Sequence, residues 1–314
     1  DNILKNLNCS PLHPNSHSTN DDEPIPDHNC HYYSTKLFCE TTSTLDSPFS
    51  IFSPKVQSLH AKIEEINIYL HLLSESNIYF DIICLQETWL SNSEDLSLFQ
   101  IEEYNLIHLG RSCSKHGGLA IYIRKHLSFE HLLSIDNQLN WEGLFIKVKI
   151  DNNHIIIGNV YRPPRNSTEL LTHFNESFST TLNYLNRYNN CIISGDLNLN
   201  LLQDNSIPRD FLSLISSEGY FPQITIPTRF NDRSATLIEI FFMKLSLNKS
   251  TLSGVMINKI SDHQGYFVSI DNSRNISMNN RNVTITSRSL NFFDDVNREI
   301  DSQRLEVRQE ADTA

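Results

Sequence analysis

Carboxylates, an amide and a histidine follow three apolar stretches of this chain, and these residue types suit metal-assisted hydrolysis of a phosphodiester. The first stretch ends in Glu87, the second in Asp196 and Asn198, and the third in Asp262 and His263. Carboxylate oxygens are good ligands for Mg²⁺, and a bound metal ion can activate water and polarise a phosphoryl oxygen. A histidine beside a carboxylate can protonate a leaving oxygen. The three motifs together therefore predict a hydrolytic site.

The apolar stretches themselves predict the elements that position these side chains. Asp81–Gln86 and Cys191–Ser194 are too short for helices and rich in Ile, Leu and Cys, as buried strands are. A buried strand that ends in a carboxylate places that charge at the rim of its sheet. Asp196 and Asn198, two residues apart, share one side of an extended chain. Taken singly, the motifs have plainer interpretations, such as an exposed strand end or an Asx turn.

The remaining patterns predict one α/β domain over residues 49–271, with two packed, mostly antiparallel or mixed sheets and helices outside them. Apolar residues at helical spacing predict helices that begin near Ser58, Asn166 and Asp210. Strands outnumber helices, which favours the two-sheet arrangement. The predicted strands are Tyr104–Leu109, Gly118–Arg124, Phe129–Ile135, Gly143–Ile150, His154–Tyr161, Ala235–Met243 and Gly265–Ile270. Residues 1–48 are expected to form a flexible polar leader, and residues 272–314 a polar tail with a short helix over Thr286–Ile300.

Composition narrows the class of protein. The chain has 314 residues, 39% of them hydrophobic, which is typical of a globular protein. No apolar run approaches the roughly 20 residues of a membrane helix. The net charge of −12 argues mildly against a protein that holds DNA by charge alone. Cys84 and Cys191 lie inside predicted strands, so we expect reduced core cysteines and an intracellular protein, nuclear or cytoplasmic.

Six motifs resemble, in order, those of the endonuclease/exonuclease/phosphatase family. More narrowly, the chain resembles the apurinic-type endonuclease domain of non-LTR (LINE-like) retrotransposons, over about residues 49–271. The Gly-Gly-Leu-Ala-Ile-Tyr and Tyr-Arg-Pro-Pro stretches favour this branch over inositol phosphatases, sphingomyelinases and deadenylases. The motifs are Gln86–Trp89, Gly117–Tyr122, Val160–Pro164, Gly195–Asn198, Ser234–Ile238 and Ile260–His263.

The resemblance implies a four-layer α/β sandwich, one Mg²⁺ or Mn²⁺, and a monomer that acts on DNA. It implies cleavage of one strand to leave a 3′-hydroxyl, which primes reverse transcription by a domain that normally follows in the same polypeptide and is absent here. Glu87 and Asp262 would bind the metal. The implied catalytic residues are Tyr161 at the scissile phosphate, Asp196 on the water, Asn198 on the pentacovalent phosphate, His263, and Glu239 in place of the aspartate that orients it. Phosphate or DNA contacts are expected from Arg162, Ser234, Thr236, Arg229 and Arg233.

Two positions depart from the pattern of the family. Its opening strand usually reads His-x-Asn-Ile, whereas this chain has Ser53-Pro-Lys55-Val. Lys55 brings a positive charge towards a cation site, and Pro54 would remove a hydrogen-bond donor from a central strand. Glu239 is one methylene longer than the usual aspartate, and a displacement of about 1 Å can cost ~100-fold in rate. Three hypotheses stay open: an endonuclease impaired in this copy, a catalytically dead relic, and a phosphatase of the same superfamily.

Overall fold

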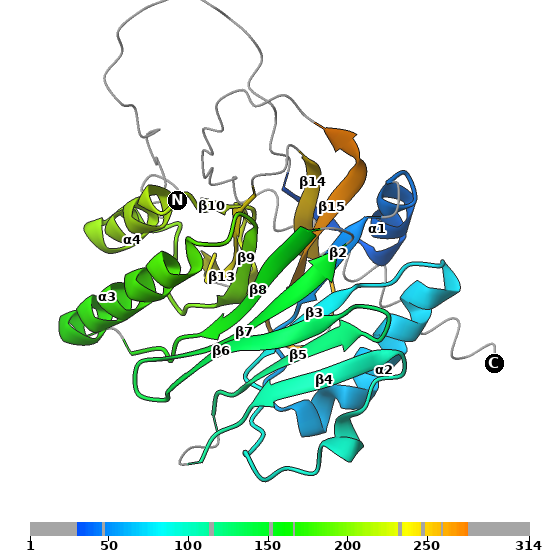
Figure 1. The fold of residues 1–314 in the computed structure, drawn as a ribbon, viewed down its shortest axis with the longest axis horizontal. Coiled ribbons are helices and arrows are strands. Elements are labelled where there is room, and N and C mark those ends of the chain that lie inside the picture. Colours follow the sequence, from blue (N-terminus) through cyan, green and yellow to red (C-terminus); the bar gives the residue numbers. More distant parts are fainter. Residues whose placement is uncertain are drawn as a thin grey trace, which may run out of the picture.

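Two sheets stacked face to face form the centre of the molecule, and helices cover both outer faces (Figure 1). The predicted four-layer α/β arrangement is thereby confirmed. The computed structural model describes residues 30–45, 48–112, 116–150, 153–165, 167–231, 234–245, 249–258 and 260–275. The expected helix over Thr286–Ile300 lies outside the described residues.

The first sheet has seven strands in the order β1-β14-β15-β2-β3-β5-β4. The pairs β1/β14 and β2/β3 are parallel, and the other neighbours are antiparallel. Its strands are β1 (His31–Tyr33), β2 (Phe49–Ser53), β3 (Ile82–Gln86), β4 (Tyr104–Leu109), β5 (Leu119–Arg124), β14 (Lys249–Met256) and β15 (Gly265–Asn275).

The second sheet has six strands in the order β10-β13-β9-β8-β7-β6, of which only β8 and β9 run parallel. A separate hairpin consists of β11 (Arg229–Asn231) and β12 (Ser234–Thr236). The six strands are β6 (Phe129–Asn137), β7 (Trp141–Ile150), β8 (Asn153–Tyr161), β9 (Cys191–Asp196), β10 (Phe221–Pro222) and β13 (Glu239–Lys244).

The helices cover the sheets in pairs. Helices α1 (Thr35–Thr42) and α2 (Leu59–Glu75), with the 3₁₀ helix η2 (Leu96–Phe99), pack on the seven-stranded sheet. Helices α3 (Thr168–Leu185) and α4 (Ser206–Ser217) pack on the six-stranded sheet, where Phe211 of α4 meets Phe242 of β13 at 5.9 Å between ring centroids. Each helix therefore buries one apolar face, as an amphipathic helix must.

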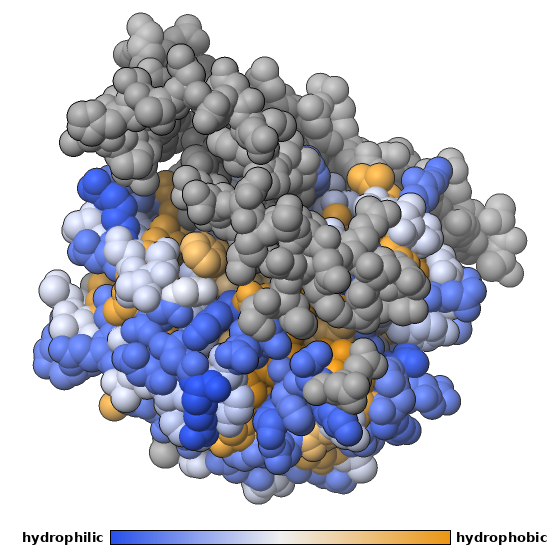
Figure 2. Space-filling view, turned by 45° about the horizontal axis from the view of Figure 1, so that its top comes forward, coloured by the Kyte–Doolittle hydropathy of each residue, from blue (hydrophilic) through white to orange (hydrophobic). Residues whose placement is uncertain are grey.

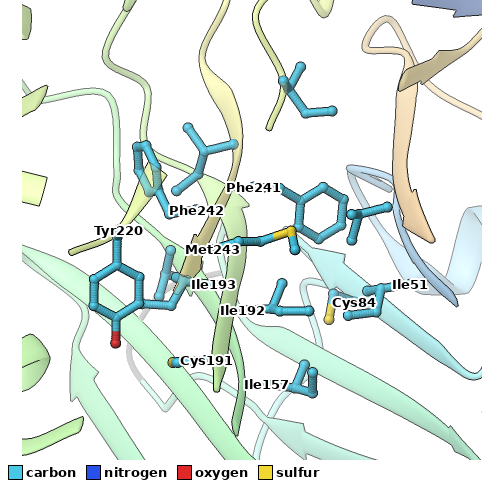
Figure 3. Packing of buried hydrophobic residues seen from close by; sticks show 14 of the residues in the cluster. Ile51, Cys84, Ile157, Cys191, Ile192, Ile193, Tyr220, Phe241, Phe242 and Met243 are labelled. Atoms are coloured by element: carbon cyan, nitrogen blue, oxygen red, sulfur yellow. The ribbon is translucent and has the colours of Figure 1, made fainter. Parts of the chain in front are cut away.

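The alternation of side chains along each strand builds the core. In β13, Phe241 points to the other sheet and lies 5.0 Å from Tyr266, whereas its neighbour Phe242 points outward to α4. Figure 3 shows Phe241 and Met243 on the side of Ile51 and Cys84, with Phe242 on the opposite side of the strand. Cys84 and Cys191 are free and fully buried, which agrees with their expected place in the core.

Residues inside the expected leader, from Cys30 onward, belong to the described structure. Strand β1 pairs in parallel with β14, and Phe38 of α1 is only 1% exposed. The strand predicted over Ala235–Met243 is divided into β12 and β13. Strand β2 ends at Ser53, so Pro54 follows the strand and does not interrupt its hydrogen bonds.

Hydrophilic side chains dominate the surface that Figure 2 shows, with isolated hydrophobic patches between them. Among the described helices, none combines the length and the hydropathy needed to cross a bilayer.

Candidate active site

A row of polar side chains crosses the six-stranded sheet at one end, on the face that meets the other sheet. Strand pairing sets Glu239 opposite Asp196, Asp196 opposite Tyr161, and Tyr161 opposite Glu142. Glu239 shares the inner face with Phe241, two residues along β13, and the residues paired with it share that face too. All four are buried. The carboxylates thus lie at the rim of a buried sheet, as predicted for Asp196.

Lys55 and Glu87 face this row from the seven-stranded sheet. Lys55 follows β2 and forms an isolated bridge with Gln86, the last residue of β3. Its Nζ lies 3.0 Å from Glu87 Oε1 and 2.9 Å from Asp196 Oδ2. Lys55 is 5% exposed, Glu87 8% and Asp196 0%. One buried ammonium therefore bridges carboxylates from the two sheets.

The protonation of this cluster follows from burial and charge. Burial alone would lower the pKa of Lys55, but the carboxylates of Asp196 and Glu87 together raise the pKa above its ordinary value. Burial raises the pKa of Asp196, and Lys55 opposes that rise. Burial, and then the charges of Glu87 and Asp196, raise the pKa of Tyr161 far above its ordinary value. Tyr161 is therefore a neutral donor, hydrogen-bonded to Glu87.

His263 is held by Glu239 on one of its ring nitrogens. Nδ1 of His263 contacts Oε1 of Glu239, and the Thr228 hydroxyl donates to Oε2 of the same carboxylate. All three residues are at most 1% exposed. The other ring nitrogen, Nε2, lies 3.6 Å from Oδ1 of Asp262. Glu239 thus reaches both partners despite its additional methylene.

A tight turn after β9 positions Asn198. Its backbone N–H donates to Oδ1 of Asp196 at 2.9 Å, and its side-chain amide donates to the Arg162 carbonyl at 2.7 Å. The Arg162 side chain is buried and donates to three backbone carbonyls, those of Leu197, Asn198 and Arg165, at 2.6, 2.9 and 2.7 Å. Arg162 therefore holds the turn in place, which corrects its expected role as a phosphate contact.

The backbone is strained around these residues. Glu87, Trp89 and Asn198 have φ values of 55°, 57° and 48°, in the left-handed region that residues other than glycine seldom adopt. Strained positions persist where the surrounding structure determines them, and they cluster at functional sites.

A cavity of about 370 Å³ opens beside the turn. Asn198, Arg229 and Thr236 contribute polar groups to its wall, and Leu199 and Ile238 contribute apolar ones. The structure thus brings two of the expected phosphate contacts, Arg229 and Thr236, to the same cavity as Asn198. Of the others, Ser234 is exposed on the β11–β12 hairpin, and Arg233 lies outside the described residues.

The two predicted metal ligands have separate cationic partners. Glu87 pairs with Lys55, and Asp262 is half exposed and pairs with Arg229 at 3.1 Å. The described part of the chain contains no group of three or more His, Cys, Asp and Glu residues that could hold a metal ion. A divalent cation between Glu87 and Asp196 would meet the Lys55 ammonium, which repels it. The residues present do not fit the implied metal.

Two residues at the site were not predicted, Glu142 and Thr228. Nε and a terminal nitrogen of Arg111 bind the two oxygens of Glu142 at 2.7 and 2.8 Å, and the guanidinium carbon lies 5.7 Å from the centre of the Tyr161 ring. Arg111 is thus a buried support for Tyr161, whose ring it contacts. Glu142 lies at the start of an apolar strand, and Glu87 lies at the end of one. A carboxylate next to an apolar run could therefore have identified Glu142 as well. Thr228 lies in a loop and carries no comparable signal.

Comparisons with known proteins agree with this fold. The profile of the Endonuclease/Exonuclease/phosphatase family matches residues 52–263. The endonuclease domain of TRAS1, a telomere-specific non-LTR retrotransposon, has a TM-score of 0.55 at 14% identity, over 72% of this chain and 100% of that chain. An AP endonuclease from Archaeoglobus fulgidus has a TM-score of 0.55 at 17% identity, over 71% of this chain and 99% of that chain. The 3′-5′ exonuclease NExo from Neisseria meningitidis has a TM-score of 0.56 at 16% identity, over 71% of this chain and 100% of that chain. At these identities the likeness concerns the fold. No curated protein sequence matches the chain.

Proposed function

The chain belongs to the endonuclease/exonuclease/phosphatase family, whose members are phosphodiester hydrolases, nucleases or phosphatases, and on this premise we propose that it is the DNA endonuclease domain of a non-LTR retrotransposon. The observation that carries the proposal is the buried cluster at the sheet rim. It unites a histidine held by a carboxylate, His263 with Glu239, and the pair Asp196 and Asn198. The likeness to the TRAS1 domain supports the choice of DNA as substrate.

The arrangement suits attack of water on a phosphodiester. Asp196 accepts a proton of the water as the oxygen attacks phosphorus. The bond between phosphorus and the 3′-oxygen breaks, and the 3′-oxygen takes a proton from solvent, which leaves a 3′-hydroxyl and a 5′-phosphate. Tyr161, a neutral donor, and the Asn198 amide then turn from their present acceptors, Glu87 and the Arg162 carbonyl, to the non-bridging oxygens, where negative charge accumulates. Glu239 fixes the proton of His263 on Nδ1, so that Nε2 faces the substrate. The 3′-hydroxyl would prime a reverse transcriptase domain of the same polypeptide, which places the activity in the nucleus.

One observation favours a second candidate, a member of the family that does not cleave. Lys55 occupies the space between Glu87 and Asp196. One positive charge against two carboxylates leaves this part of the site with a net negative charge, which opposes a phosphate. Such a protein would bind DNA weakly and leave it intact.

Nicking of supercoiled plasmid tests the proposal. The chain is assayed in Mg²⁺, in Mn²⁺ and in EDTA, beside His263→Ala and Asp196→Asn. His173→Ala and Asp210→Asn are matched controls, since both residues are exposed and lie on the outer helices. Open circles from the unaltered chain and both controls, and none from the two site variants, support the endonuclease.

The other outcomes decide among the alternatives. DNA binding without nicking in every condition supports the non-cleaving member. Hydrolysis of inositol phosphates without nicking of DNA would assign the chain to the phosphatases. If the chain neither binds DNA nor hydrolyses any of these substrates, all three hypotheses are refuted.

A further inference from the structure

We propose that the Lys55 ammonium is the resident cation of this site: it occupies the place between Glu87 and Asp196 that a divalent metal ion would need, so the folded chain binds no divalent metal there. The inference concerns the site of the proposed function, but its test does not depend on cleavage of DNA.

The geometry is that of a cation between two anionic ligands. Nζ lies at nearly equal distances, 3.0 and 2.9 Å, from one oxygen of Glu87 and one of Asp196. The Lys55 side chain is 6% exposed and those of its partners are 11% and 0% exposed, so water screens these charges little. Ionisation of two buried carboxylates this close has a high free-energy cost unless a positive charge lies between them. Lys55 supplies that charge.

The backbone holds Lys55 at this place. Pro54 fixes the direction of the chain after β2. Residues 55–59 then run beside residues 86–88, through hydrogen bonds from Val56 N to Gln86 O at 3.1 Å and from Ser58 N to Glu87 O at 2.9 Å. Lys55 itself pairs with Gln86 as an isolated bridge. Residue 55 is therefore tied to the strand that ends in Glu87.

The two carboxylates also accept hydrogen bonds from other residues. Tyr161 hydrogen-bonds to Glu87, and the Asn198 backbone donates to the second oxygen of Asp196 at 2.9 Å. A metal ion could enter only if the ammonium left both carboxylates, and it would then lie beside a displaced positive charge in a buried space. It follows that Mg²⁺ does not act from the position between Glu87 and Asp196.

Binding of Mn²⁺ to the full chain, followed by the electron paramagnetic resonance of the free ion, tests the inference. The unaltered chain is compared with Lys55→Asn, which removes the charge, and Lys55→Arg, which keeps it. Lys62→Asn, on the outer surface of α2, is the matched control. We expect Lys55→Asn to bind one Mn²⁺ per chain at least about tenfold more tightly than the other three proteins. The double variant Lys55→Asn/Asp196→Asn should lose that site.

Two results would overturn the inference. One is binding of one Mn²⁺ by the unaltered chain as tightly as by Lys55→Asn, with loss of that binding in Asp196→Asn. The other is a folded Lys55→Asn that binds no Mn²⁺. If Lys55→Asn does not fold, the comparison of the unaltered chain with Asp196→Asn decides alone. Equal numbers of bound Mn²⁺ ions per chain support the inference, and one ion fewer in Asp196→Asn refutes it. A chain that neither binds Mn²⁺ nor nicks DNA would uphold the inference while the proposed function fails.

Discussion

Each buried charge at the site has a specific partner, because a buried charge without one is costly. Arg111 neutralises Glu142, and Lys55 pairs with both Glu87 and Asp196. The first pair supports the ring of Tyr161, and the second joins the two sheets. Removal of one partner should therefore affect stability as well as chemistry.

Replacement of Lys55 by methionine, which fills a similar volume without charge, should destabilise the chain in EDTA. Glu87 and Asp196 would face each other without a counter-charge, and loss of one partner from a buried ion pair costs about 3–5 kcal/mol. Urea denaturation of the two proteins measures the difference in the free energy of unfolding. Lys62→Met, at an exposed pair with Glu65, should change it by less than about 0.5 kcal/mol. A loss below about 1 kcal/mol for Lys55→Met would show that the carboxylates do not depend on the ammonium.

The residues that follow apolar strands could be predicted from the sequence, because a buried strand fixes where its last side chain must lie. Asp196 and Asn198 were predicted in this way, and His263 from its place beside Asp262 ahead of a predicted strand. The pairing of β13 with β9 and the contact of His263 with Glu239 bring them to one rim. The partners of Lys55 could not be predicted, since they depend on the register between segments far apart in the chain. For the same reason the contact of Arg111 with Tyr161 could not be predicted. It depends on the pairing of β7 with β8, which sets Glu142, the partner of Arg111, opposite Tyr161.

At the scale of elements, most strands of both sheets were predicted, because turns separate their apolar runs, whereas β10 and β14 were not. Strand β1 and helix α1 were missed, since β1 has three residues and α1 eight, too short for a period to show. What fixes them is tertiary packing: β1 pairs with β14, and Phe38 of α1 stacks on Phe80 at 5.5 Å and meets Phe267 edge-on at 4.6 Å.

Truncation of Phe38 tests whether α1 belongs to the fold. Phe38→Ala should lower the free energy of unfolding by about 3–5 kcal/mol, because it opens a cavity between α1 and the seven-stranded sheet. Its neighbour Leu37 is 44% exposed, and Leu37→Ala should cost less than about 0.5 kcal/mol. Chemical denaturation of the two variants gives both values. Equal, small losses would mean that residues 30–45 are a loosely attached leader after all.

At the scale of the whole molecule, the site exists only while the two sheets are docked. Lys55 and Glu87 come from one sheet and Asp196 from the other. Beneath the site a buried hydrogen-bond network crosses the same interface: Gln86 donates to Asn159 at 2.7 Å, and Ser194 donates to Ser53. Polar networks that cross a core favour one arrangement of its layers, although Oε1 of Gln86 has no hydrogen-bond partner among the described residues. The register of the sheets, and hence the site, is fixed by polar as well as apolar contacts.

Tyr266 is the residue through which this network can be tested. Its hydroxyl accepts from Ser53 at 3.0 Å and donates to the carbonyl of Gly195, next to Asp196, at 3.1 Å. Tyr266→Phe keeps the ring but removes the donor to the Gly195 carbonyl and one of the partners of Ser53, which should cost about 1–3 kcal/mol. Tyr184→Phe, at a tyrosine that is 41% exposed, should cost less than about 0.5 kcal/mol. Thermal and urea unfolding, followed by fluorescence and by circular dichroism, measure both variants. Because the network spans the sheets, the two probes should report one coincident transition at a lower midpoint in Tyr266→Phe. Two separate transitions, or no loss of stability, would show that the apolar core alone docks the sheets.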